Sequence, residues 1–412
     1  MTARRSYWAL YLTRFVSSLG YITVLTLLPF YIDALGAEGL VVGLFVTALG
    51  VGRTLAIVPV GWAADRFDKR AVLLLSMAVS ATAYALFVVV DSSLGFVLAR
   101  GLQGLGIVGT GMVSLALVGD LATRDSRARQ IGKYNSWRMA AGILGSISAA
   151  TLYEVYGFDP IFAAIVVLFS LAIVALWLYV PRDETRISGF PFRDLAVNER
   201  ILTITSFRAQ YAVAVTLVRN WIPIFVGLSA ARGGLEITGF ALGAIVAAEK
   251  FTNMLCQPLT GRISDRHGRG LFVAGGGAVY GLLALAVPLA PAIAAALGLG
   301  ASLPVLGPVP SVFFVLLALN GLLGVADAVR EPASMALFAD EGEGQGITSS
   351  FGIRGIVWRP GALLAPLLGG YLMDAVGMAA VFVVAGVAAL TGAVTMVGII
   401  VVRQGPRALW RW

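Results

Sequence analysis

Long apolar runs recur along almost the whole chain, and they restrict its possible folds more than any other feature. Residues 71–90, 161–180 and 379–402 are runs of mostly apolar residues, and roughly 20 such residues form an α-helix that crosses a bilayer. Only 13% of the 412 residues are charged, whereas a typical soluble domain has about 25%. The sequence therefore predicts an all-α integral membrane protein located, as a multi-pass protein, in the cell membrane.

Basic residues indicate how the chain crosses the bilayer. The twelve predicted membrane-spanning helices are residues 6–33, 39–61, 71–90, 94–120, 131–155, 159–181, 201–228, 237–261, 270–290, 311–339, 347–374 and 379–402. With the N-terminus inside, 19 of the 30 Lys and Arg residues fall in inner loops or termini, and one, Arg232, falls in an outer loop. Because cytoplasmic loops carry such an excess, both termini are predicted to be cytoplasmic. Topology and contact with lipid headgroups then explain the net charge of +8 without a nucleic-acid partner.

The two halves of the chain repeat each other, which indicates an internal duplication. The charged turn "GWAADRFDKR" (61–70) recurs 200 residues later as "GRISDRHGRG" (261–270). The sequence "RGLQG" (100–104) recurs 220 residues later as "NGLLG" (320–324). Insertions between helices explain why the offset changes along the chain. Duplicated halves of this kind are an architecture of secondary transporters.

The longest polar segment divides the chain near its midpoint. We interpret residues 182–200 as a cytoplasmic linker between an N-terminal six-helix bundle, residues 1–181, and a C-terminal six-helix bundle, residues 201–412. The sequence thus predicts two pseudo-symmetric bundles of six transmembrane helices each. The apolar segment 288–310, rich in Gly and Pro, is expected to be an outer loop.

These motifs resemble those of the major facilitator superfamily. The two charged turns resemble that family's signature loop and its second-half copy, and "RGLQGLGIVGTG" (100–111) resembles the Arg-containing motif of its helix 4. The resemblance implies a transporter that works by alternating access, with a monomer as the family default. It extends to drug-proton antiporters, although residues 140–152 contain glycines without the proline of their helix-5 motif.

The resemblance also implies roles for individual residues. Arg100 corresponds to the helix-4 arginine that the family links to proton handling, although hydrogen bonds to backbone carbonyls are the alternative. The signature loops are conformational latches in the family, and we assign that role to Asp65, Arg66, Arg70, Asp265, Arg266 and Asp120. Because Asp favours helix N-termini, Asp65 and Asp265 are also expected to stabilise the start of the next helix.

The densest group of intramembrane charges lies in "LNGLLGVADAVREPASM". Asp327, Arg330 and Glu331 are spaced i, i+3 and i+4, so they share one helix face, and Pro332 frees a backbone carbonyl. Two carboxylates against one arginine leave one poorly compensated, and such a group could take up a proton. We therefore predict that Asp327, Glu331, Arg330, Glu249 and Arg100 couple transport to protons. The alternative is a local ion pair in which Arg354 or Arg359 takes part.

Other polar and aromatic residues inside the predicted spans are candidates for binding the substrate. They are Arg53, Arg219, Lys250, Gln103, Asn220, Trp221, Asn253, Asn320, Arg354 and Trp358. Arg14 and Arg208 lie nearer the cytoplasmic end of their helices and are interpreted as structural. Adjacent helical residues point about 100° apart, so Glu249 and Lys250 are each expected to have a partner on another helix.

The leading hypothesis is a proton-coupled secondary transporter that exports lipophilic or drug-like compounds; the alternative is a transporter of an organic anion bound by intramembrane arginines. A membrane-embedded enzyme is disfavoured because His267 and Cys256 are the only His and Cys residues and no nucleophile–base pair lies in the spans. For the same reason no metal site or cofactor is expected. No Walker motif is present, so ATP is not expected to drive the protein. A non-transporting sensor is disfavoured because neither terminus is long enough for a signalling domain.

Overall fold

The computed structural model is almost entirely helical and describes residues 2–182, 199–298, 302–303, 307–308, 310–341, 347–410 and 412. Contacts between residues divide the chain into two compact units. Unit 1 comprises Met1–Gly189 and Thr238–Gly243, and unit 2 comprises Phe190–Ile237 and Ala244–Trp412. The predicted linker, residues 182–200, lies for the most part outside the described residues.

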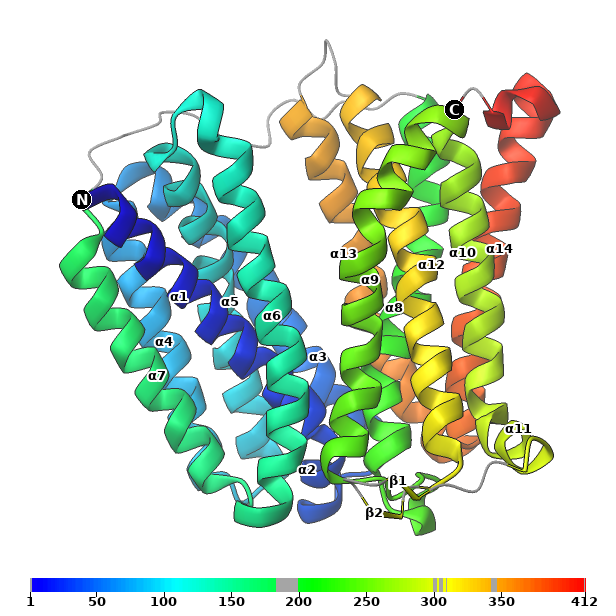
Figure 1. Cartoon of the computed structure of the whole chain (residues 1–412), viewed down its shortest axis with the longest axis horizontal. Helices are drawn as coiled ribbons and strands as arrows, with labels where there is room; N and C mark the ends of the chain where they lie inside the picture. Colours follow the sequence, from blue (N-terminus) through cyan, green and yellow to red (C-terminus); the bar gives the residue numbers. More distant parts are fainter. Residues whose placement is uncertain are drawn as a thin grey trace. The chain divides into compact units, whose positions relative to one another are not determined.

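Unit 1 consists of seven α-helices (Figure 1). They are α1 (Thr2–Thr26), α2 (Leu28–Ala34), α3 (Gly39–Arg66), α4 (Lys69–Val89), α5 (Ser93–Leu121), α6 (Arg124–Tyr156) and α7 (Asp159–Tyr179). The first predicted span is not one straight helix, since α1 and α2 meet at an angle of 48°. Pro29 explains the break, because a proline ring clashes with the carbonyl four residues earlier and cannot donate a hydrogen bond.

The described part of unit 2 begins with α8 (Glu199–Gly227) and contains most of α9 (Gly239–His267). Its other elements are η1 (Ala230–Arg232), α10 (Arg269–Ala286), η2 (Val287–Leu289), α11 (Ala290–Ala296), β1 (Ser302–Leu303), β2 (Gly307–Pro308), α12 (Val312–Glu341), α13 (Ile347–Ala375), α14 (Met378–Gln404) and η3 (Pro406–Trp410). Residues 288–310, which are predicted to be an outer loop, connect α10 to α12 and include α11 and the antiparallel pair β1–β2. The alanine-rich sequence of α11, with a proline in its first turn, favours a helix there.

The helices of each unit contact one another in a corresponding order. In unit 1, α1 packs against α6 and α7, while α4 packs against α5 and α7. In unit 2, α8 packs in the same way against α13 and α14, while α10 packs against α12 and α14. This correspondence agrees with the sequence repeats, because it matches the first, third, fourth, fifth and sixth predicted spans of each half.

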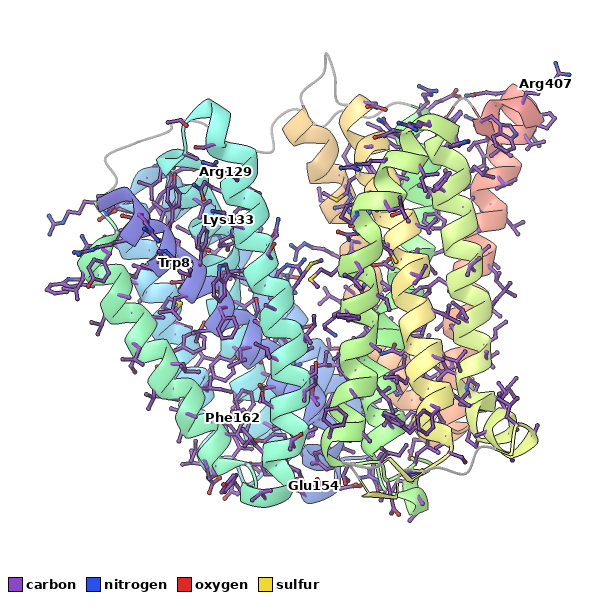
Figure 2. The ribbon with its side chains drawn as sticks, in the orientation of Figure 1. Trp8, Arg129, Lys133, Glu154, Phe162 and Arg407 are labelled. Atoms are coloured by element: carbon purple, nitrogen blue, oxygen red, sulfur yellow. The ribbon has the colours of Figure 1, made fainter. Side chains whose placement is uncertain are left out.

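Nine helical stretches among the described residues are long and apolar enough to cross a membrane, or ten if the bent pair α1–α2 counts as one span. The predicted spans 131–155 and 237–261 correspond to α6 and α9, which are not among them. Both helices carry charged residues along their length. Figure 2 shows this for α6, where Arg129 and Lys133 lie toward one end and Glu154 near the other.

Two glycines allow very close helix contacts in the two units, at corresponding positions of the repeat. A β-carbon built on Gly104 of α5 would lie 2.3 Å from the backbone oxygen of Leu49 of α3. On Gly324 of α12 it would lie 2.2 Å from the backbone oxygen of Glu249 of α9. Backbone oxygens cannot give way as flexible side chains do, so both pairs of helices depend on the missing β-carbon.

Replacing Gly324 by alanine is therefore expected to destabilise the protein by about 1–3 kcal/mol, the usual cost of overpacking. Thermal unfolding of the purified protein in detergent micelles measures the effect. The matched control is Gly321→Ala, since a β-carbon there would lie 3.5 Å from Thr252 Cγ2, an ordinary contact. Equal melting temperatures for the two variants would contradict the proposed close contact.

Candidate functional site

Asp327 of α12 is the centre of a buried group of charges in unit 2. Its Oδ1 accepts from Arg330 Nη2 (2.6 Å) and from the Tyr211 hydroxyl (3.0 Å). Its Oδ2 accepts from Arg219 Nη2 of α8 (2.8 Å) and from Asn253 Nδ2 of α9 (3.4 Å). Three helices thus supply donors to one carboxylate, which is buried.

Glu331 continues the group toward α13. Its two oxygens accept from Arg330 and from Arg354 Nη2, the latter at 2.5 Å. The expectation that one carboxylate would be poorly compensated was wrong, because each of the two carboxylates contacts two arginines. Local spacing identified the pairing with Arg330, but the other cations come from distant parts of the chain.

Pro332 has the effect on α12 that its sequence position suggests. A proline cannot donate to the carbonyl four residues earlier, which here is that of Ala328. The Thr260 hydroxyl of α9 donates to that oxygen instead, at 2.6 Å. The freed carbonyl therefore joins α12 to α9 next to the charged residues.

Glu249 of α9 extends the group in the other direction. Its Oε1 accepts from Arg219 Nε at 2.6 Å, and Lys250 Nζ lies 3.8 Å from its Oε2. Glu249 therefore has the partner on another helix that its position predicted. The same turn of α9 is held against α12 by Gly324.

Six residues thus form a continuous series of opposite charges, which we call the ion-pair chain. Its members in spatial order are Glu249, Arg219, Asp327, Arg330, Glu331 and Arg354. Asp327, Arg330 and Glu249 are buried, whereas the side chain of Arg219 is 41% exposed and that of Glu331 is 26% exposed. Burying an ion is costly unless it is paired, so each member depends on its neighbours.

Arg208 and Trp358 lie beside the Arg354 end of the ion-pair chain. Arg208 Nε of α8 donates to the backbone oxygen of Arg354 at 2.8 Å, and its guanidinium carbon lies 4.7 Å from the centre of the Trp358 ring. Both Arg354 and Trp358 are on α13, one helical turn apart. The sequence assigned Arg208 a structural role and gave no sign of this neighbourhood.

Arg100 and Gln103 belong to unit 1 and form a different arrangement. Arg100 donates to the backbone oxygen of Phe45 (3.0 Å) and to Gln103 Oε1 (2.6 Å), and Gln103 donates to the Tyr84 hydroxyl (2.7 Å). Arg100 is buried. The hydrogen bond to a backbone carbonyl agrees with the alternative interpretation of Arg100. The role of Arg100 in proton handling stays a prediction.

The other predicted substrate-binding residues have varied surroundings. Asn253 contacts Asp327 and Gly324, but Asn220 and Asn320 donate to the backbone oxygens of Thr216 and Ile245. Trp221 is completely buried in the contact between α8 and α13, against Gly369. Arg53 is exposed on α3, in unit 1. Only Arg219, Lys250, Asn253, Arg354 and Trp358 of this set lie on or beside the ion-pair chain.

The predicted latch residues lie at helix ends, with one correction. Asp68 caps α4 by accepting from the Arg70 amide at 2.9 Å, whereas Asp65 and Asp265 lie in the last turns of α3 and α9. The expected capping by Asp65 and Asp265 was therefore wrong, because α3 and α9 continue beyond them. Arg66 lies over the Trp62 ring, Arg70 donates to the Trp177 carbonyl, and Arg266 is exposed.

Equivalent ion pairs form at these helix ends in the two units. Lys69 at the start of α4 pairs with Asp120 of α5 at 2.8 Å. Arg269 at the start of α10 pairs with Asp340 of α12 and, at 2.8 Å, with Asp265. Sequence analysis missed Lys69 and Arg269, although the 200-residue repeat that matched their neighbours also relates these two basic residues.

Comparisons with known proteins agree with this architecture. The sequence model of the Major Facilitator Superfamily matches residues 10–306 and 212–410. The chain belongs to the major facilitator superfamily. It is therefore a multi-pass protein of the cell membrane, and the curated relatives that it resembles are named as transporters.

Curated relatives are similar over part of their length. An uncharacterized transporter of Buchnera aphidicola subsp. Schizaphis graminum is 24% identical over 44% of this chain and 46% of its own. The inner membrane transport protein YajR of Escherichia coli is 26% identical over 45% of this chain and 40% of its own. The matched part thus spans about half the length of these relatives, or less.

Solved structures share the fold at low identity. The POT family transporter PepTSo matches with a TM-score of 0.71 and 13% identity, over 95% of this chain and 97% of its own. A mutant of the nucleoside transporter NupG matches with a TM-score of 0.75 and 13% identity, over 96% of this chain and 99% of its own. At this identity the likeness shows the fold alone.

Proposed function

We propose that this member of the superfamily is a proton-coupled secondary transporter that works by alternating access. The observation that carries the proposal is the ion-pair chain of unit 2, with three carboxylates and three arginines on four helices. A local structural ion pair would need only two of these residues. Protonation of one carboxylate removes its attraction for two arginines at once, so it shifts the balance between conformations.

The exposure of Arg219 supports the proposal that water, and hence protons, can reach the ion-pair chain. Its side chain is 41% exposed, although it lies well inside α8, between Val218 and Asn220. An arginine facing lipid inside a bilayer costs several kcal/mol. The exposed part of Arg219 is therefore proposed to face water, so that protons reach Glu249 and Asp327 through it.

The topology of the proposal follows the sequence prediction. Twelve helices cross the membrane, α6 and α9 among them, and both termini are cytoplasmic. Glu249 and Lys250 lower the hydropathy of α9, but the pairing of Glu249 with Arg219 and with Lys250 offsets their cost in the membrane. The protein is a monomer with two six-helix bundles, residues 1–181 and 201–412, which are joined by the linker 182–200.

The ion pairs at the helix ends are proposed to act as the conformational latch. These are the pairs of Lys69 with Asp120 and of Arg269 with Asp340. The other proposed latch residues are Asp65, Arg66, Arg70, Asp265 and Arg266.

The charge balance near the ion-pair chain supports one of the two substrate classes. The paired signature loops favoured export of lipophilic or drug-like compounds over transport of an organic anion. The ion-pair chain is neutral by itself, but Lys250 and Arg208 at its two ends add two positive charges. This excess supports an organic anion as the substrate, with proton-linked export of uncharged or cationic compounds as the second candidate.

Proteoliposomes with an imposed pH gradient test the proposed function. Two probes are used: toluenesulfonate, which stays anionic at all relevant pH values, and ethidium, a lipophilic cation. One pH unit is worth about 1.4 kcal/mol, so one-to-one coupling supports roughly tenfold accumulation of a transported probe. Accumulation of toluenesulfonate on the alkaline side is the expected result, while expulsion of ethidium toward the acid side would favour drug export. Movement of either probe without any response to the gradient would contradict proton coupling.

A further inference from the structure

Arg208 is a buried cation with an unused donor. Its residue is 7% exposed, and its Nη1 is buried without an acceptor among the residues that the structure describes. An unsatisfied buried donor on a charged group is costly. In a native structure such a group calls for an explanation, and a functional role or an ion bound to it is among the known ones.

The neighbours of Arg208 suggest the chemistry of that ligand. Arg354 contributes its backbone oxygen to Arg208 and its Nη2 to Glu331, so two guanidinium groups lie near a single carboxylate. The planar donors of arginine match carboxylate, sulfonate and phosphate groups. The half-buried indole of Trp358 beside them offers an apolar surface to the body of an organic molecule.

We propose that Arg208, Arg354 and Trp358 form the subsite that binds the anionic group of the transported molecule, an organic anion with an apolar or aromatic body. This inference rests on the proposed transport function, because the anion is taken to be the substrate. The anion would accept from Arg208 Nη1 and share Arg354 with Glu331. Since Arg208 is covered in this structure, binding requires a conformation in which α13 exposes it, and Pro360 and Pro366 within α13 weaken the helix where it would bend.

The position of Glu331 fixes the sign of coupling between anion and proton. Ionised Glu331 holds Arg354 and competes with the anion for it, whereas protonated Glu331 does not. A proton on Glu331 therefore strengthens anion binding, and by linkage the anion strengthens proton binding to the same degree. Cooperative binding of this kind carries anion and proton in the same direction.

Binding of toluenesulfonate to the purified full chain in neutral-lipid nanodiscs tests the subsite without transport. The readout is the rise in melting temperature with probe concentration, which gives a Kd. In the wild type, the Kd is expected to increase as the pH rises. At one pH, the Kd of Arg208→Gln is expected to be at least ten times that of the wild type, and the Kd of Arg208→Lys is expected to lie between the two. Because Arg208 also donates to the Arg354 carbonyl, the melting temperature of each variant without probe is its own baseline, and only the rise caused by the probe gives the Kd.

Arg14→Gln is the matched control. Arg14 of α1 also lies over an aromatic ring of its unit, that of Tyr134 at 5.1 Å, but no ion pair of Arg14 is found among the described residues. Its Kd for toluenesulfonate is expected to equal that of the wild type. Uncharged toluenesulfonamide is expected to bind neither protein, which ties the effect to the charge.

Three results would overturn the inference. The first is an equal loss of affinity in Arg14→Gln and Arg208→Gln, and the second is an unchanged Kd in Arg208→Gln. The third is stabilisation through Arg208 by phosphatidylglycerol in the nanodiscs but not by toluenesulfonate, which would assign the subsite to a lipid headgroup. Anion binding that depends on Arg208 but not on pH would keep the subsite while contradicting the proposed proton coupling, so the two failures are distinguishable.

Discussion

Replacing Asp327 by alanine is expected to destabilise the protein by about 3–5 kcal/mol, the usual cost of removing one partner from a buried ion pair. The variant leaves Arg330 buried with only Glu331 as its acidic partner, and Arg219 with only Glu249. It also removes the acceptor of the Tyr211 hydroxyl. Chemical unfolding in detergent micelles measures the loss, which is expected to be the largest of any single substitution in unit 2.

Asp340→Ala is the matched control on the same helix. Asp340 also pairs with an arginine, Arg269, but its side chain is 54% exposed, and exposed pairs contribute only about 0–1 kcal/mol. The double variant Asp327→Ala/Arg330→Ala is expected to be more stable than the sum of the two single losses predicts, since it removes both charges of the pair. Equal losses in Asp327→Ala and Asp340→Ala would contradict a buried, mutually dependent chain of ions.

Much of the architecture could be predicted because it depends on local composition. Apolar runs of helical length gave the helices, and the repeat of residues 61–70 at 261–270 indicated two related halves. The bend between α1 and α2 and the helix α11 were not predicted. The bend depends on how a proline acts in its helix, since Pro29 breaks a span whereas Pro223 lies within a continuous α8. The helix α11 depends on an alanine-rich stretch of only seven residues.

The site was predictable only to the extent that its residues lie close together in the sequence. The spacing of Asp327, Arg330 and Glu331 placed them on one helix face. Arg354, 23 residues beyond Glu331, was already among the further partners considered for this group, and its pairing with Glu331 is confirmed. The pairing of Asp327 with Arg219 of α8, 108 residues away along the chain, was not predicted. Spacing within a helix gives no information about which side chains of other helices meet it. The contacts of Arg208 with Arg354 and Trp358 were missed for the same reason, because they bring together α8 and α13.

Glu331→Gln is expected to separate binding from coupling. Glutamine keeps the size of the side chain but cannot exchange a proton, and as a neutral group it competes weakly for Arg354. The variant should therefore bind toluenesulfonate with a Kd that no longer depends on pH and that equals the low-pH value of the wild type. In proteoliposomes it should move the probe down its own gradient but lose the roughly tenfold accumulation that one pH unit supports.

Asp374→Asn is the control for this second experiment. It removes a carboxylate near the C-terminal end of α13, outside the ion-pair chain. This variant should keep both the pH dependence of binding and the accumulation of the probe. If Glu331→Gln still accumulated the probe in response to a pH gradient, the coupling proton would have to be carried elsewhere. Glu249 would then be the remaining choice, because Asp327 accepts from four groups at once whereas Glu249 shares only Arg219 and a more distant Lys250. A Glu331→Gln variant that lost binding as well would show that Glu331 positions Arg354 for the anion, so that the carboxylate organises the subsite instead of competing with it.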